Sequence, residues 1–186
     1  TQGDSSQTTT SWPEPFDGWL RVELELSGSG AVEVTSPDVV VKGVVLHSSA
    51  DSALRLDGAN NFMLHGSYIN VDGYGLLRLT DQNATDSTIY IENSDNVQIG
   101  GSEPSQRNIV SWCKVSCIEV QSSEDFVMHG NYIGVGADAV ANQGGAAVGV
   151  LFQDSTNVDV GGNKDNHEGN TFMYNLDGAI DIEDSQ

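Results

Sequence analysis

The sequence predicts an all-β fold, built as a solenoid of short parallel strands. Three observations support this prediction. Helical periodicity is nearly absent, short runs of alternating apolar and polar residues recur from residue 22 to residue 182, and Gly, Asn, Asp and Ser bound these runs. A period of two is typical of strands, because successive side chains of a strand point to opposite faces. Runs that recur at similar intervals indicate a repeat architecture.

Six copies of one pattern follow one another along the chain. Each complete copy has two apolar positions separated by one residue, a polar turn, two further apolar positions and a glycine; the copies begin at Gly30, Ser52, Ser87, Ser116, Val148 and Asp177. Equivalent apolar positions are 22, 35, 29, 32 and 30 residues apart, which is typical of a solenoid that tolerates insertions. The sixth copy holds only its first strand. We therefore expect the helix to continue beyond residue 186 in the parent protein, or to stack end to end with another copy.

A third short apolar segment follows most copies, at residues 66–70, 107–111, 130–134 and 169–173. Three short strands close one coil, and about six coils stacked at roughly 4.8 Å would align equivalent side chains in rows. The expected inward rows are Val32, Leu54, Ile89, Ile118, Val150 and Ile180, and two residues later Val34, Leu56, Ile91, Val120, Phe152 and Ile182. A row of Asn108, Asn131 and Asn170, with Ser67 in register, is expected at one corner of the coil, where side-chain amides can bond along the stack.

Two regions depart from the repeat. Residues 1–18 are polar and show no strand pattern, so we interpret them as an amino-terminal cap or flexible segment, in which Trp12 and Phe16, with Trp19 just beyond, could cover the first coil. The helix itself is expected over residues 19–186. Residues 73–87 contain a strand-like stretch that comes too early for the next copy. We interpret this region as a loop that leaves the coil sideways, and the sequence does not give its strand register.

Four motifs resemble the repeats of a known family. They are NVQIGG at 96–101, RNIVS at 107–111, GNYIG at 130–134 and NVDVGG at 157–162. They are similar to the repeats of right-handed parallel β-helix proteins of the secreted and cell-surface type, within the pectate-lyase-like superfold. The resemblance covers roughly residues 30–186 and implies the fold and an extracellular location. It does not choose a function, because that family includes surface proteins, adhesin-like stalks, viral spikes, polysaccharide lyases and hydrolases.

In polysaccharide-cutting members of this fold, the working residues protrude from one sheet. The corresponding outward positions here are Glu33, Arg55, Tyr90, Glu119, Leu151 and Asp181. The acids Glu33, Glu119 and Asp181 are the candidate catalytic residues, and Arg55 and Tyr90 are candidate glycan contacts. The simpler interpretation of this row is an ordinary solvated sheet face. The motifs of galacturonase-like hydrolases are absent, which disfavours that activity, and a lyase would need a base that the sequence does not single out.

Cysteine and metal chemistry remain open in the sequence. Cys113 and Cys117 could form a disulfide or remain two half-buried thiols. The four histidines are scattered, so no zinc site is expected. The acids Asp38, Asp95 and Asp125, with Asn60 between them, are expected at the same turn position of successive coils. Stacked carboxylates repel one another, so this prediction leaves room for a structural calcium ion.

The chain has 27 acidic residues and 7 Lys plus Arg, a formal net charge of −20. This excess argues against nucleic acid as a partner and suits either simple solubility or a saline exterior. No apolar stretch is long enough to span a membrane. The sequence therefore favours a non-catalytic structural or adhesive segment of an extracellular assembly. The alternative is a carbohydrate-active β-helix, either an enzyme that cleaves polysaccharide or a glycan-binding spike.

Overall fold

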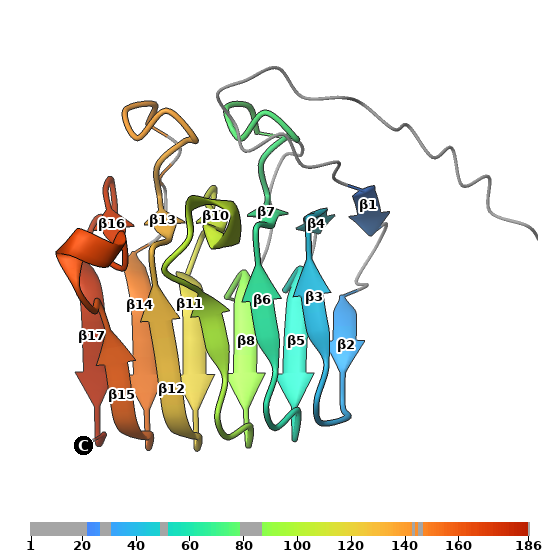
Figure 1. Cartoon of the computed structure of the whole chain (residues 1–186), viewed down its shortest axis with the longest axis vertical. Coiled ribbons are helices and arrows are strands. Elements are labelled where there is room, and N and C mark those ends of the chain that lie inside the picture. Colours follow the sequence, from blue (N-terminus) through green and yellow to red (C-terminus); the bar gives the residue numbers. More distant parts are fainter. Residues whose placement is uncertain are drawn as a thin grey trace, which may run out of the picture.

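The computed structural model describes residues 22–26, 31–48, 52–78, 87–142, 144 and 147–185. Their strands form a parallel β-helix of three sheets, which confirms the predicted fold class (Figure 1). The cap expected at residues 1–18, with Trp12, Phe16 and the following Trp19, lies outside the described residues. Within the described ranges, no helix is long and apolar enough to cross a membrane.

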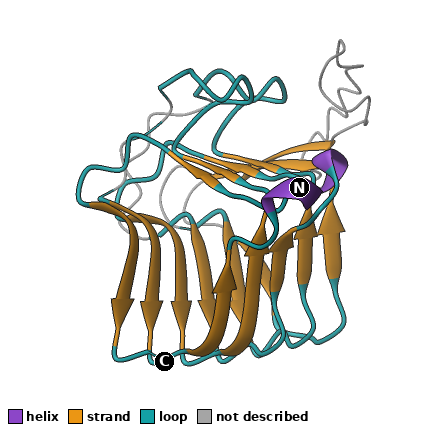
Figure 2. Ribbon diagram, turned by 60° about the vertical axis from the view of Figure 1, so that its left-hand side comes forward, coloured by secondary structure: helices purple, strands orange, loops and turns teal. Residues whose placement is uncertain are grey.

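Each complete coil contributes one strand to each sheet, and equivalent strands lie side by side along the helix axis (Figure 2). Sheet A contains β1 (Val22–Leu26), β4 (Val44–Ser48), β7 (Tyr68–Ile69), β10 (Ile109–Val110), β13 (Tyr132–Ile133) and β16 (Thr171–Phe172). Sheet B contains β2 (Val32–Val34), β5 (Leu54–Asp57), β8 (Ile89–Glu92), β11 (Ser116–Gln121), β14 (Val148–Gln153) and β17 (Gly178–Glu183). Sheet C contains β3 (Val40–Lys42), β6 (Met63–His65), β9 (Gln98–Gly100), β12 (Glu124–His129) and β15 (Thr156–Val160). Two 3-10 turns, η1 (Pro104–Gln106) and η2 (Lys164–Asn166), lie in the connections after sheet C.

The core lies inside the coil and consists of the two predicted apolar rows with their counterparts from sheets A and C. The strand registers of sheet B align both rows as the sequence predicts. In the middle coils these side chains are fully buried, and the rings of Phe126 and Phe152 meet edge to face with centroids 5.4 Å apart. Stacked burial of equivalent residues is the main source of stability in such a helix.

Polar side chains satisfy the backbone at two corners. At the corner between sheets C and A, the Oδ1 atom of each amide accepts the backbone N–H of the preceding coil: Asn108 bonds to Ser67, Asn131 to Asn108 and Asn170 to Asn131. The Nδ2 atoms of the same asparagines donate to Leu64, Ile99 and Met128 carbonyls. Between sheets B and C, serine hydroxyls act in the same way, with Ser94, Ser123, Ser155 and Ser185 each accepting a backbone N–H from the coil before. These side chains give hydrogen-bond partners to backbone N–H and C=O groups that the buried turns would otherwise leave unpaired.

The turn positions assigned to Asn60 and Asp95 in the sequence are wrong. Left-handed backbone with φ of 54–60° marks the equivalent residues of this turn, which are Asp38, Asn61, Asn96, Asp125 and Asn157. Asp95 lies one residue earlier, in register with Asn60 and Glu124. Two amides therefore separate Asp38 from Asp125, and these amides form hydrogen bonds along the stack. Asp38, Asp95 and Asp125 therefore do not form the row of stacked carboxylates on which the expectation of calcium depended.

Cys113 and Cys117 form a disulfide, with Cα atoms 5.0 Å apart and both residues buried. The bond ties the connection after β10 to the start of β11. Closing so short a loop restricts the unfolded chain by about 2 kcal/mol. We expect a reductant to lower the urea midpoint of unfolding accordingly, and to leave a Cys113→Ala/Cys117→Ala double variant unchanged. An unshifted midpoint in the native chain would show that the bond does not contribute to stability.

The strand-like stretch within residues 73–87 is part of a loop, and residues 79–86 lie outside the description. An antiparallel bridge between Val71 and Arg78 closes the loop. A second loop, closed by Val135 and Asn142, has the same internal hydrogen bonds, with Asp138 in a role like that of Asp72. The two loops contact each other, since the N–H of Ala137 donates to the Gly75 carbonyl at 2.9 Å. They cover a second apolar cluster on the outer face of sheet A, formed by Val45, Tyr68, Val71 and Ile109 with Trp112, Tyr132 and Ala137 packed against it.

Candidate functional site

The outer face of sheet B carries every side chain that the sequence singles out as a catalytic or glycan-binding candidate. Strand pairing aligns them in one row: Glu33, Arg55, Tyr90, Glu119, Leu151 and Asp181. A parallel row lies two residues further along each strand: Asp57, Glu92, Gln121, Gln153 and Glu183. Successive strands are about 4.8 Å apart, so each row is a line of side chains along the helix axis.

Arg55 and Tyr90 are in direct contact. The guanidinium carbon of Arg55 lies 4.5 Å from the centroid of the Tyr90 ring, and its Nη2 atom lies 2.7 Å from Glu92 Oε1. The side chains of Arg55 and Glu92 are 38% and 25% exposed, so a molecule in solution can reach both. The contacts nonetheless hold the guanidinium in one orientation, because ring and carboxylate constrain it from two sides.

Tyr90 connects the two rows. Its hydroxyl donates to Gln121 Oε1 at 2.6 Å on the next strand. Burial raises the pKa of Tyr90 above its ordinary value, and the neighbouring Glu92 and Glu119 raise it further, while Arg55 opposes them. Because the ordinary pKa of tyrosine is about 10, the phenol stays protonated at neutral pH and remains a hydrogen-bond donor.

The candidate acids are not arranged as a catalytic pair. Glu119 accepts a hydrogen bond from Ser87 Oγ. Asp181 lies two strands further on, about 10 Å away along the row, and Leu151 stands between them. Glu33 lies at the opposite end, beside Arg55. Glycoside hydrolysis requires two carboxyl groups that flank one bond at about 5–10 Å. Among the three candidate acids, Glu119 and Asp181 come nearest to this range, and the apolar Leu151 lies between them.

Among the described residues, no group of three or more His, Cys, Asp or Glu side chains could hold a metal ion. His65 and His129 occupy equivalent positions with Gly100 between them, so they lie on alternate coils. Burial lowers the pKa of His65, and the neighbouring Lys42 lowers it further. His129 instead approaches Asp159 at 3.2 Å. The two imidazoles are thus in separate surroundings.

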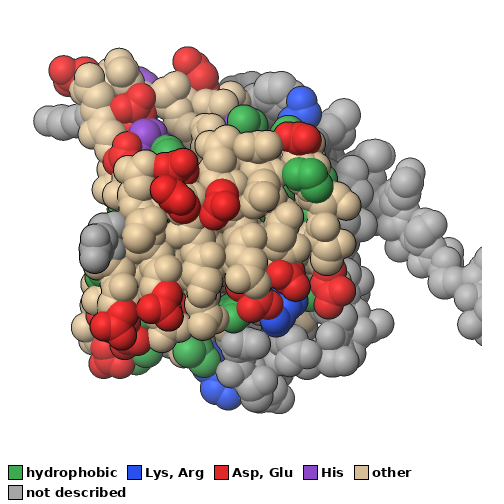
Figure 3. Space-filling view, turned by 90° about the horizontal axis from the view of Figure 1, so that it is seen from below, with side chains coloured by type: hydrophobic (Ala, Val, Ile, Leu, Met, Phe, Trp, Pro, Cys, Tyr) green, Lys and Arg blue, Asp and Glu red, His purple; other side chains and the backbone are tan. Residues whose placement is uncertain are grey.

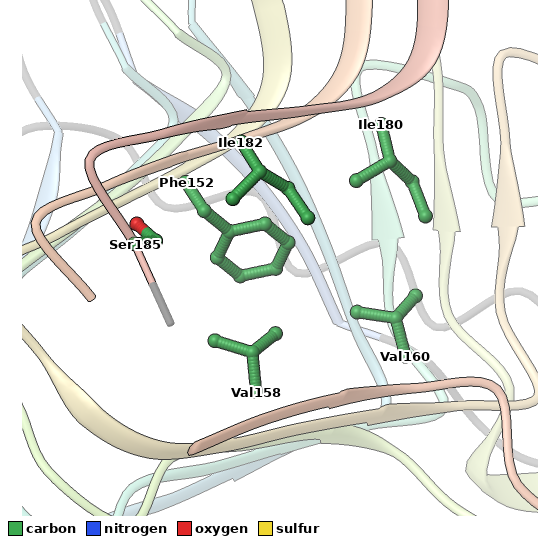
Figure 4. Close-up of a pocket in the computed structure, with 6 residues that line it drawn as sticks. All are labelled: Phe152, Val158, Val160, Ile180, Ile182 and Ser185. Atoms are coloured by element: carbon green, nitrogen blue, oxygen red, sulfur yellow. The ribbon is translucent and has the colours of Figure 1, made fainter. Parts of the chain in front are cut away.

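Two other surfaces lack the features of a glycan site. Acidic side chains far outnumber Lys and Arg on the face seen in Figure 3, which looks onto the turns between sheets B and C. Such a face repels polyanions. At the last coil, a hollow opens among the inward residues Phe152, Val158, Val160, Ile180 and Ile182, with Ser185 at its edge (Figure 4). Its single hydroxyl offers a sugar little to bond with, so this hollow is the cross-section of the core.

The sequence interpretation missed Arg107, Trp112 and Tyr132, and it expected Arg78 near the outward row of sheet B if the strand of Arg78 joined that sheet. Arg78 lies over the ring of Trp112, and Arg107 lies over the ring of Tyr132, both on the sheet A side. The third segment of the repeat could have indicated the tyrosines of this outer face. Tyr68 and Tyr132 come immediately before the inward residues Ile69 and Ile133, which places the two tyrosines on the outer face.

No family model matches the chain, and no curated protein matches it. Among solved structures, the chain is similar to the enzymatically active domain of tailspike protein 2 from bacteriophage CBA120, with 16% sequence identity and a TM-score of 0.47. The match covers 80% of this chain and 26% of that one, so the chain spans about a quarter of the length of the tailspike domain. A likeness at this identity and TM-score assigns no activity.

Proposed function

We propose that this chain is a non-catalytic, glycan-binding β-helix of a secreted or surface-exposed protein, and that the outer face of sheet B contacts the glycan. The network of Arg55, Tyr90, Glu92 and Gln121 carries the proposal. Of the two carbohydrate-active roles that the sequence analysis gives as the alternative, this is the one that binds a glycan without cleaving it. It also agrees with an adhesive segment, because glycan binding is one means of adhesion.

The chemistry of the network suits a sugar. Each sugar hydroxyl both donates and accepts hydrogen bonds, and the network offers guanidinium donors, a carboxylate acceptor, an amide and a phenol within two adjacent rows. These side chains already hold one another in place, so binding would cost little further side-chain entropy. The rows run along the helix axis with a rung about every 4.8 Å, which presents a linear polymer with repeated contacts.

The charge of the same face indicates the type of glycan. Its two rows contain six acidic residues (Glu33, Asp57, Glu92, Glu119, Asp181 and Glu183) and one arginine, which is paired with Glu92. A polyuronate would be repelled here. We therefore propose a neutral polysaccharide as the ligand of sheet B. The positions of Glu119, Leu151 and Asp181 support binding without cleavage, and the buried disulfide supports an oxidising, extracellular environment.

The test is a binding panel of neutral and acidic oligosaccharides, measured by titration calorimetry, with reducing ends assayed in parallel. We expect a neutral oligosaccharide to bind without release of new ends. Arg55→Ala and Tyr90→Ala should each weaken this binding about tenfold, since each removes contacts worth one to two hydrogen bonds. Tyr174→Ala, which changes an exposed tyrosine away from sheet B, is the matched control and should bind as the native chain does. Equal binding by all three variants, or a panel without any binding, would rule out this face as a glycan site.

A further inference from the structure

We infer that the sheet A side of the helix holds a second, separate site, which binds a carboxylate-bearing sugar through Arg78 and Arg107. The two arginines lie over rings of one apolar cluster. Arg78 Cζ is 5.0 Å from the centroid of Trp112, and Arg107 Cζ is 4.2 Å from that of Tyr132. Both rings pack against the cluster that includes Ile109, and Ile109 is directly paired with Tyr132.

Both guanidiniums retain N–H donors that no described residue accepts. Arg107 Nε donates to the Gly130 carbonyl at 2.9 Å, and this is the one hydrogen bond of its side chain to the described part of the chain. Arg78 has no hydrogen bond or ion pair with any described residue. Arg55 on sheet B differs, because Glu92 neutralises it. Among the described residues, Arg78 and Arg107 have no carboxylate partner, although acids outnumber Lys plus Arg by 27 to 7 in the sequence.

Stacking determines how these arginines can act. A guanidinium that lies over a ring has one face covered, and its edge is left to present N–H groups in a planar fork. That fork matches the two oxygens of a carboxylate. Trp112 and Tyr132 are both partly exposed beside these arginines, so the exposed ring edges can also contact the apolar part of a sugar. A carboxylate attached to a sugar ring satisfies both features, whereas a small inorganic anion satisfies the fork alone.

The acidity of the chain does not prevent such a site. At physiological ionic strength, charges further away than about 8 Å are largely screened, so a bound carboxylate responds chiefly to the nearest groups. The acids of the two adjoining loops, Asp72 and Asp138, are engaged with backbone N–H groups of their own loops. Hydrogen bonds from Ala141 and Val140 lower the pKa of Asp138. The site is independent of sheet B, which faces another side of the coil.

The experiment compares trigalacturonate with galactotriose, its uncharged counterpart, by titration calorimetry on the whole chain at 50 and 300 mM salt. We expect trigalacturonate to bind at the lower salt and to weaken at the higher salt. Arg78→Gln and Arg107→Gln should each weaken that binding about tenfold. Arg107→Lys should weaken it as well, because lysine keeps the charge but loses the fork. Arg55→Gln is the matched control on sheet B and should leave it unchanged.

Three results would overturn this inference. The first is binding of galactotriose that Arg78→Gln and Arg107→Gln weaken as much as they weaken binding of trigalacturonate. The second is loss of trigalacturonate binding in Arg55→Gln together with retention in Arg78→Gln and Arg107→Gln. The third is displacement of trigalacturonate by an equal concentration of sulfate, which would show a simple anion site. Urea unfolding of every variant verifies that the fold is intact. Because the sheet B variants are scored with neutral sugars, failure at one site is distinguishable from failure at the other.

Discussion

Replacement of Ile118 by alanine is expected to lower the free energy of unfolding by about 2–5 kcal/mol. Ile118 lies on β11 in the middle of an inward row, between Ile89 and Val150, and it is fully buried. Removing its side chain leaves a cavity that packed neighbours in the coils above and below cannot fill. Urea unfolding followed by circular dichroism measures the loss.

The matched control lies in the same row. Ile180→Ala removes the same atoms, but Ile180 is 40% exposed on β17 and has a packed neighbour on one side, Val150. We expect it to cost clearly less than Ile118→Ala, because less apolar surface returns to water and no enclosed cavity forms. Equal losses for the two variants would contradict the claim that the interior of the middle coils dominates stability.

The second large effect is expected at Asn131, whose replacement by alanine should cost about 3 kcal/mol. Asn131 is fully buried. Its Oδ1 atom accepts the backbone N–H of Asn108 at 3.1 Å, and its Nδ2 atom donates to the Ile99 carbonyl at 2.8 Å. Alanine would remove the acceptor of the Asn108 N–H and one donor to the Ile99 carbonyl where water does not enter. The midpoint and slope of urea unfolding report this change.

Asn166 offers a matched control for Asn131. It is exposed in η2, so Asn166→Ala should change the free energy of unfolding by less than about 0.5 kcal/mol. A result in which Asn131→Ala is as mild as Asn166→Ala would show that the corner amides are replaceable by water. The row of asparagines would then make no net contribution to the free energy of unfolding.

The two proposed sites rest on different faces and different charges. On sheet B, the single arginine is paired with Glu92 within an acidic surface. On the sheet A side, Arg78 and Arg107 lie on rings and have no carboxylate partner among the described residues. A glycan with both neutral and acidic sugars could therefore contact both faces, each through its own chemistry. The variant sets above separate these contributions.

The sequence by itself determined the coil and its interior. The alternation around Ile118 and Val120 recurs in every copy, and a strand has one way to place such residues on a single side. The corner position of Asn131 was equally visible, because an asparagine recurs before the third strand of three successive copies and Ser67 takes its place in an earlier one. The outward row from Glu33 to Asp181 followed from the same alternation. These features depend on local periodicity, which the chain carries without reference to its fold.

Only the tertiary structure decided the contacts between different rows and segments. Asp95 was placed one residue out of register, because turns lack the period that aligns strands. The pairing of Arg55 with Glu92 joins two rows, and no local pattern links them. The loops at 72–78 and 136–142 have the same pattern of internal hydrogen bonds but different amino acids at equivalent positions. Their equivalence was therefore not apparent from the sequence. The arginine stacks on Trp112 and Tyr132, like the closure of the Cys113–Cys117 disulfide, require distances in space that spacing along a sequence does not specify.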